Sequence, residues 1–292
     1  MGEVRGAGDG GPTIVTDPQR MHREVLAARG RGRRVGFVPT MGALHAGHVS
    51  LVERAAAECD DVAVSIFVNP TQFGPDEDFT RYPRRLEADI AAIQGCGVTW
   101  VFAPPADAVY PPGWATRVVV EGPARRFEGE LRPGHFSGVA TVVCRLFLAV
   151  PADAAYFGAK DWQQTLVVKR MVRDLGLPIG IAVCPTVREP DGLALSSRNA
   201  YLSPDERLRA TALHESLVQA EQAWLAGGEV AAIEQAMRAH IAARGIAVDY
   251  AAIVDRDSLE PLASPTAGVV ALVAGRLGAT RLIDNRLLPH RD

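Results

Sequence analysis

The chain has 292 residues, of which 48% are hydrophobic and 22% charged, and its formal net charge is -3. This length can bury one large hydrophobic core or two ordinary ones, and there is no basic excess of the kind that binds nucleic acid non-specifically. We expect small molecules or proteins as partners, and neither nucleic acid nor a membrane. The glycine-rich start lacks an apolar signal segment and the four cysteines form no CxxC pair, which together indicate a cytoplasmic protein with reduced thiols.

The first part of the chain predicts strands alternating with helices. A helix is expected over 18–30, with Asp17 as its N-cap and Pro18 at its first position. Strands follow at VGFVPT and DVAVSIFV with a helix between them. Further elements are a helix near 84–94, the strand VTWVFA, an apolar helix over 138–149, the strand AAYFG, a helix over 162–175 and the strand IGIAV. This alternation predicts an α/β fold with a Rossmann-like, doubly wound parallel sheet.

The pattern changes beyond Pro185. Two alanine-rich helical stretches, 204–226 and 230–244, precede short strands around VDYAAIVD, GVVALVAGRLG and TRLIDN. We therefore expect a Rossmann-like domain over residues 1–186 and a smaller C-terminal α+β domain over residues 187–292. The segment NPTQFGPDEDFTRYP follows the second predicted strand and is too polar for a core, so we expect it as a loop at the carboxyl end of the sheet, where such folds bind ligands.

The segment PTMGALHAGH carries two histidines, His45 and His48, at a predicted strand-to-helix turn. Glycines there allow backbone N–H groups and the positive helix end to meet a phosphate, and the spacing of three places both imidazoles on one face. A lone histidine is more often a surface or core residue. A zinc site would need further ligands, and neither HExxH nor a cysteine cluster lies nearby. No GxGxxG follows the first strand, which disfavours a dinucleotide site.

Two other segments carry polar side chains at predicted turns. YFGAKDWQQ contains Lys160 and Asp161, which in isolation fit a helix capped by Asp161 with a solvated lysine. LALSSRN contains Ser196, Ser197 and Arg198, which in isolation form an ordinary polar loop. Taken with the histidines, these groups are the donors that stabilise a charged pentacovalent phosphorus.

These segments resemble, in one order, the pantothenate synthetase (pantoate–β-alanine ligase) family of coenzyme A biosynthesis. The resemblance covers residues from about 35 to 285 and rests on PTMGALHAGH, VSIFVNPTQF, YPR, LRPGHFSGVATVV, YFGAKDWQQ, PTVREPDGLALSSRN and TRLIDN. HAGH and LSSR also resemble the signatures of the wider nucleotidyltransferase superfamily, which includes class I aminoacyl-tRNA synthetases. The resemblance implies that the two histidines act at ATP, with His48 as the proton donor.

The same resemblance implies a role for each matching residue. It implies catalytic roles for His45, His48, Lys160, Ser196, Ser197 and Arg198. It implies ATP binding by Met41, Gly42, Ala43, Leu44, His45, Ala46, Gly47, His48, Gly158, Ala159, Lys160, Asp161, Val187, Leu195, Ser196, Ser197 and Arg198. Gln72 and Gln164 would bind pantoate and β-alanine, since neutral amides orient hydroxyls and a carboxylate without neutralising the nucleophile. Residues near the site would include Tyr82, Arg132 and His135.

Three positions depart from the family pattern. The family normally has glutamate, methionine and an aromatic residue, commonly tyrosine, where this chain has Ala159, Leu195 and Trp162. Leu195 has a volume similar to methionine and should keep an apolar contact. Ala159 removes a carboxylate, which leaves the role of that position open.

The implied reaction activates pantoate with ATP to pantoyl adenylate and pyrophosphate, and β-alanine then displaces AMP. Mg²⁺ is expected with ATP, no protein metal ligand is assigned, and the resemblance suggests a homodimer. One alternative is a nucleotidylyltransferase that stops after adenylyl transfer, against which Gln72, Gln164 and NPTQF argue. The other is a non-catalytic ATP sensor, which would not release AMP.

Overall fold

The computed structural model describes residues 11–75, 77–262 and 268–291, so the glycine-rich start over residues 1–10 lies outside the described part. The chain divides into two compact units. The first contains Met1–Gly158 and Gln164–Cys184, and the second contains Ala159–Gln163 and Pro185–Asp292. Five residues after Gly158 thus group with the C-terminal half, an arrangement that the sequence does not predict.

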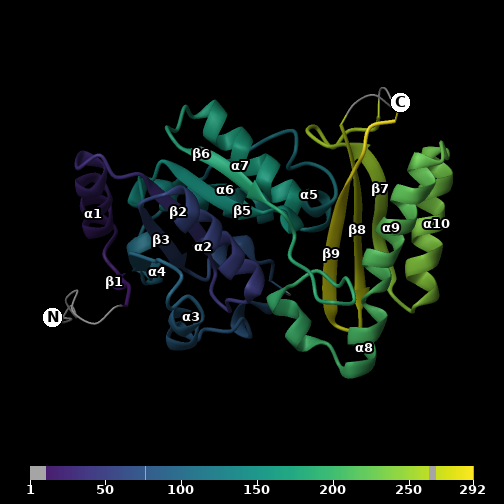
Figure 1. Ribbon diagram of the computed structural model, residues 1–292, viewed down its shortest axis with the longest axis horizontal. Helices are drawn as coiled ribbons and strands as arrows, with labels where there is room; N and C mark the ends of the chain where they lie inside the picture. The colour runs from purple at the N-terminus through teal and green to yellow at the C-terminus, as the bar shows by residue number, and fades with distance from the viewer. Residues whose placement is uncertain (1–10, 76, 263–267, 292) are drawn as a thin grey trace. The chain divides into compact units, whose positions relative to one another are not determined.

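The first unit contains a six-stranded parallel sheet in the order β1-β4-β3-β2-β5-β6. All of these strands except β4 are labelled in Figure 1. Its strands are β1 Thr13–Val15, β2 Val35–Thr40, β3 Asp61–Ile66, β4 Trp100–Phe102, β5 Ala154–Gly158 and β6 Gly180–Cys184. The predicted Rossmann-like, doubly wound sheet is confirmed. The prediction omitted β1, because three residues are too few to show a period of two.

Helices cover both faces of this sheet. They are α1 Pro18–Gly30, α2 Ala46–Glu58, α3 Leu86–Ala92, α4 Ala106–Val109, α5 Glu128–Leu131, α6 His135–Ala149 and α7 Trp162–Asp174. Successive strand residues point to opposite faces, so Phe37 joins one core with α1, α6 and α7, whereas Val38 joins another with α2 and α3. The sheet is therefore buried on both sides, as parallel sheets normally are.

Local capping explains where two of these helices begin. The carboxylate of Asp17 accepts a hydrogen bond of 2.6 Å from the N–H of Arg20, which confirms Asp17 as the N-cap of α1. Helix α6 was expected from Gly138, but it begins at His135. Gly134 directly precedes it with φ of +84°, a left-handed conformation that separates α6 from the short helix α5.

The order of the strands creates a switch point between β2 and β5. From β2 the chain proceeds outward through β3 and β4, and it then returns to place β5 on the other side of β2. Ligands of open α/β sheets bind at the carboxyl ends of the strands where the order reverses. The segments that leave these ends begin at Met41 after β2 and at Ala159 after β5.

The segment that follows β3 is less exposed than its composition suggests. It contains two short 3-10 helices, η1 Pro70–Gln72 and η2 Asp78–Thr80. The prediction of a polar loop too hydrophilic for a core is wrong at Asn69, Asp78 and Tyr82, which are 1%, 8% and 6% exposed. Burial of these polar groups requires hydrogen-bond partners.

The second unit combines an antiparallel sheet, β7-β8-β9, with helices, which confirms the predicted α+β character. Its elements are η3 Ala159–Asp161, η4 Ser197–Tyr201, α8 Pro204–Arg209, α9 Ala212–Leu225, α10 Val230–Ala243, β7 Ala247–Asp255, β8 Val269–Leu277 and β9 Thr280–Leu288. The single helical stretch expected over 204–226 divides at Thr211. Its hydroxyl donates to the carbonyl of Leu208 at 2.9 Å and so competes with the helical hydrogen bonds.

Three general features concern the whole described part. None of its helices has the length and apolar character needed to cross a membrane. All four cysteines are free thiols. No group of three or more histidine, cysteine, aspartate or glutamate side chains in residues 11–75, 77–262 and 268–291 is arranged to hold a metal ion.

Candidate functional site

The two histidines of HAGH stand at the entry of α2 and cap it together. His45 is the N-cap, and its Nδ1 accepts from the N–H of Gly47 at 3.1 Å. The N–H of His45 in turn faces Nδ1 of His48 at 3.4 Å, and the two ring centroids are 4.2 Å apart. When it is neutral, an imidazole that accepts at Nδ1 carries its hydrogen on Nε2. The pair is thus arranged as two Nε2–H donors.

Several backbone donors of the preceding turn already have acceptors. The N–H of Gly42 donates to the hydroxyl of Thr40 at 3.2 Å. The N–H groups of Ala43 and Leu44 donate to the two carboxylate oxygens of Asp89 at 3.1 and 2.7 Å. The N–H groups of these three residues are therefore occupied by protein acceptors, and ATP binding by this turn stays a prediction.

Asp89 was not among the predicted residues, although the sequence carries a signal for it. It lies on α3 in the helically spaced apolar series Leu86, Ile90 and Ile93, and it is only 4% exposed. A carboxylate on the buried side of a helix needs hydrogen-bond donors. The sequence does not reveal that these donors lie more than 40 residues earlier.

Gln72 lies at the end of η1 and is held from two sides. Its Oε1 accepts from Nδ2 of Asn69 at 3.0 Å, and its Nε2 lies 3.1 Å from Sδ of Met41. Asn69 also donates to the carbonyl of Gly138 at 3.2 Å. At Gly138 a Cβ would lie 2.2 Å from the carbonyl oxygen of Thr71, so this close approach requires glycine. The structure thus brings the predicted acyl-substrate residue to the turn that carries the histidines.

Arg132 and His135 support Gln72 through its backbone. Nδ1 of His135 donates to the carbonyl of Gln72 at 2.8 Å, and its Nε2 accepts from Arg132 at 3.0 Å. Burial and the neighbouring Arg132 charge lower the pKa of His135 to about 4, so the ring is neutral near pH 7. Arg132 also forms a bidentate ion pair with Glu77 at 2.6 and 2.7 Å. Burial raises the pKa of Glu77, but the Arg132 hydrogen bond and charge outweigh it and lower the pKa.

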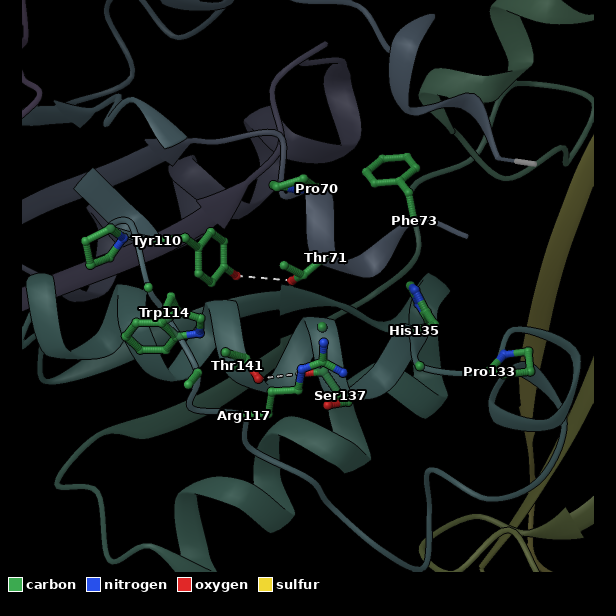
Figure 2. A pocket seen from close by; sticks show the side chains of 15 residues that line it. Pro70, Thr71, Phe73, Tyr110, Trp114, Arg117, Pro133, His135, Ser137 and Thr141 are labelled. Atoms are coloured by element: carbon green, nitrogen blue, oxygen red, sulfur yellow. Dashed lines mark hydrogen bonds between the residues drawn. The ribbon is translucent and has the colours of Figure 1, made fainter. Parts of the chain in front are cut away.

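A pocket of about 630 Å³ is lined in part by Pro70 and Thr71 of η1 (Figure 2). It is lined by Pro70, Thr71, Phe73, Tyr110, Pro111, Gly113, Trp114, Ala115, Arg117, Pro133, Gly134, His135, Ser137, Gly138 and Thr141. Figure 2 shows the Tyr110 hydroxyl directed at Thr71, a contact of 3.2 Å. His135 lines this pocket, but His45, His48 and Gln72 do not, so the pocket does not unite the predicted site residues.

In the second unit, the turn that carries Lys160 is held by Asn285. Nδ2 of Asn285 donates to the carbonyls of Ala159 and Lys160 at 2.9 and 2.7 Å. Nε1 of Trp162 donates to the carbonyl of Arg256 at 2.8 Å, a bond that a tyrosine at this position would not reproduce in the same form. These bonds explain why Ala159–Gln163 groups with the C-terminal part of the chain. Asn285 belongs to the motif TRLIDN, yet its partner could not be read from the sequence.

The predicted nucleotide segment of the second unit is also internally ordered. The N–H of Leu195 donates to the carbonyl of Val187 at 3.0 Å, so these two predicted residues are adjacent. Ser196 caps η4, and its hydroxyl accepts from the N–H of Arg198 at 3.3 Å. Ser197 is the first residue of η4. In the first unit, Gln164 lies half-buried in the first turn of α7.

Several known proteins are similar to this chain over most of its length. The family model described as pantoate-beta-alanine ligase matches residues 13–287. A pantothenate synthetase of Thermus thermophilus is 56% identical over 256 residues, which cover 86% of this chain and 92% of that protein. The pantothenate synthetase of Moorella thermoacetica is 53% identical over 270 residues, with coverage of 92% and 95%.

Two solved structures extend the comparison to the fold. A crystal structure of the Thermus thermophilus enzyme has a TM-score of 0.90 and 51% identity, covering 94% of this chain and 99% of that one. The pantoate-beta-alanine ligase of Francisella tularensis, solved with beta-gamma ATP and beta-alanine, has a TM-score of 0.79 and 34% identity, covering 94% and 97%. The family match over most of the chain, together with these identities, shows that the chain belongs to the pantoate–β-alanine ligase family.

Proposed function

We propose that this chain joins pantoate to β-alanine in an ATP-dependent, AMP-forming ligase reaction that yields pantothenate. The observation that carries the proposal is the 3.1 Å contact between Gln72, the proposed acyl-substrate residue, and Met41 of the histidine turn. The reaction needs this proximity, because a carboxylate must reach the α-phosphorus of ATP. Family membership and the ATP and β-alanine named for the Francisella tularensis structure add independent support.

In the first step, a carboxylate oxygen of pantoate attacks the α-phosphorus of ATP. The new P–O bond forms as the bond to the β,γ-diphosphate breaks, which gives pantoyl adenylate and pyrophosphate. His45 and His48 donate from Nε2 to phosphate oxygens, and His48 is the proton donor. The other donors assigned to the developing negative charge are Lys160, Ser196, Ser197 and Arg198. ATP is used as its Mg²⁺ complex, in keeping with the preference of Mg²⁺ for phosphate oxygens and water.

In the second step, the amine of β-alanine attacks the acyl carbon of the adenylate. The C–N bond forms, the acyl–oxygen bond to AMP breaks, and the amine loses a proton. Gln72 and Gln164 orient pantoate and β-alanine through neutral amides, which leave the carboxylate nucleophilic. No covalent bond to the enzyme is needed in this scheme.

The remaining assignments follow from the family resemblance. We assign ATP and pantoate binding to residues 1–186, and a lid and support role to residues 187–292. Residues 41–48, Gly158 to Asp161, Val187 and Leu195 to Arg198 are the proposed ATP contacts. A homodimer working in the cytoplasm is proposed on the same basis, and sedimentation of the purified chain would test the dimer.

Isotope exchange tests the central proposal. Enzyme with ATP, Mg²⁺ and pantoate, but without β-alanine, should exchange labelled pyrophosphate into ATP, because the first step is reversible. Omission of pantoate should abolish the exchange, and the variants Gln72→Ala and Gln164→Ala should slow it. AMP should accumulate in step with pantothenate once β-alanine is added. Exchange without pantoate, or exchange that requires β-alanine, would contradict the ordered two-step reaction.

A further inference from the structure

The turn between β2 and α2 has a backbone conformation that its own residues do not favour. Gly42 has φ of +83° and Ala43 has φ of +52°, so two successive residues are left-handed. This conformation is unfavourable for alanine and persists only where the surroundings impose it. The turn therefore depends on contacts from elsewhere in the fold.

Asp89 supplies these contacts. Its two carboxylate oxygens accept the N–H groups of Ala43 and Leu44, and the side chain is 4% exposed. Successive backbone N–H groups that point to one side form a concave site that binds an anion. In this turn the bound anion is the carboxylate of Asp89. At Gly42 a Cβ would lie 2.7 Å from Oδ2 of Asp89, so the carboxylate also demands glycine there.

The position of both histidines depends on this anchor. Leu44 directly precedes His45, which is the N-cap of α2. His45 and His48 share the reciprocal capping bonds at the helix entry, so the two rings are coupled. A change in the path of residues 43 and 44 would thus shift both imidazoles at once.

We propose that Asp89 is a positioning residue for the adenylation step, which it serves by filling the anion site of the histidine turn and thereby aiming His45 and His48. The inference rests on the proposed function and deepens it. It also implies that the anion site formed by Ala43 and Leu44 is closed to the phosphates of ATP. Asp89 acts through the turn and does not touch the substrate.

Asp89→Asn tests this directly, because the amide has the same shape but replaces one accepting oxygen by an NH₂ group that cannot accept. Pantoate-dependent pyrophosphate exchange at saturating ATP should fall by about 10- to 100-fold, the loss expected from displacement of a catalytic group by a fraction of an ångström to an ångström. Amide hydrogen exchange at Ala43 or Leu44 should accelerate in the same variant. Its melting temperature should fall only modestly below that of wild type.

Asp61→Asn is the matched control. Asp61 is also a buried carboxylate of the first unit, 6% exposed, but it pairs with Arg33 and Thr99 at the start of β3. Its substitution should lower the melting temperature. It should leave the rate of pyrophosphate exchange per folded molecule within about twofold of wild type. The proposal is wrong if Asp89→Asn slows pyrophosphate exchange no more than Asp61→Asn does. It is also wrong if the amides of residues 43 and 44 stay protected from hydrogen exchange in Asp89→Asn.

Gly42→Ala tests the same contact by a change in the turn instead of in Asp89. It provides a second test in case the Asp89→Asn protein does not fold. It should slow pyrophosphate exchange, because the added methyl group displaces the carboxylate. In the double variant with Asp89→Ala the clash with the carboxylate is absent, while the contact with Ile66 at 3.1 Å and the left-handed backbone remain. The combined loss should therefore be smaller than the product of the two single losses. Strictly multiplicative losses would overturn the proposal. Wild-type protein without pantoate-dependent exchange would refute the ligase function, whereas the amide measurements would still test the anchor.

Discussion

Acidification should destabilise the first unit through His135. In the folded protein its pKa is lowered to about 4 by burial and by Arg132, against an ordinary value of 6.5. Between these values the unfolded chain binds a proton that the folded chain does not, so stability is lost as the pH falls from about 6.5 to 4. The loss attributable to His135 is about 2 kcal/mol at pH 5 and about 3 kcal/mol at pH 4, from 1.36 kcal/mol for each pH unit.

Urea unfolding of wild type and His135→Gln at pH 7.5 and pH 5 would measure this loss of stability. Glutamine retains a donor and an acceptor but does not titrate, so the stability advantage of wild type over the variant should shrink by about 2 kcal/mol at pH 5. The measurement stays at pH 5 because Glu77, whose pKa is lowered, loses its own contribution only below its unfolded value of 4.5.

His290→Gln, the same substitution at an exposed histidine, is the matched control. If the difference between wild type and His135→Gln is the same at pH 7.5 and pH 5, the ring titrates normally in the folded protein. The hydrogen bonds from Arg132 to His135 and from His135 to the carbonyl of Gln72 would then be absent in solution.

Two further predictions concern adenylation. His48→Ala should slow pantoate-dependent pyrophosphate release by about 10²- to 10³-fold with little loss of folded protein, as for other single donors to a transition state, and an unchanged rate would remove His48 from the mechanism. Lys160→Ala should raise KM for ATP and lower kcat together, because the ammonium is proposed to contact phosphates both before and during reaction. If Lys160 is only a surface charge, steady-state kinetics would leave both constants unchanged.

Much of the fold was predictable because its signals are local. The alternation of apolar strands and helices predicts the doubly wound sheet, and Asp17 with Pro18 predicts the start of α1. Helix ends were less predictable where one residue changes the backbone locally, as Gly134 does before α6 and Thr211 does between α8 and α9. The buried state of Asn69 was missed because its partners include the carbonyl of Gly138, far along the chain.

The sequence by itself determined the succession of elements, the presence of the HAGH, GAKD and SSR segments, and the resemblance that implies the ligase reaction. The tertiary structure alone decided which distant groups hold these segments. Asp89 reaches back to Ala43 and Leu44, and Asn285 reaches the carbonyls of Ala159 and Lys160 across 126 and 125 positions. Such pairs leave no periodic trace in the sequence, because the packing of strands and helices, and not spacing along the chain, brings a buried polar group to its partner.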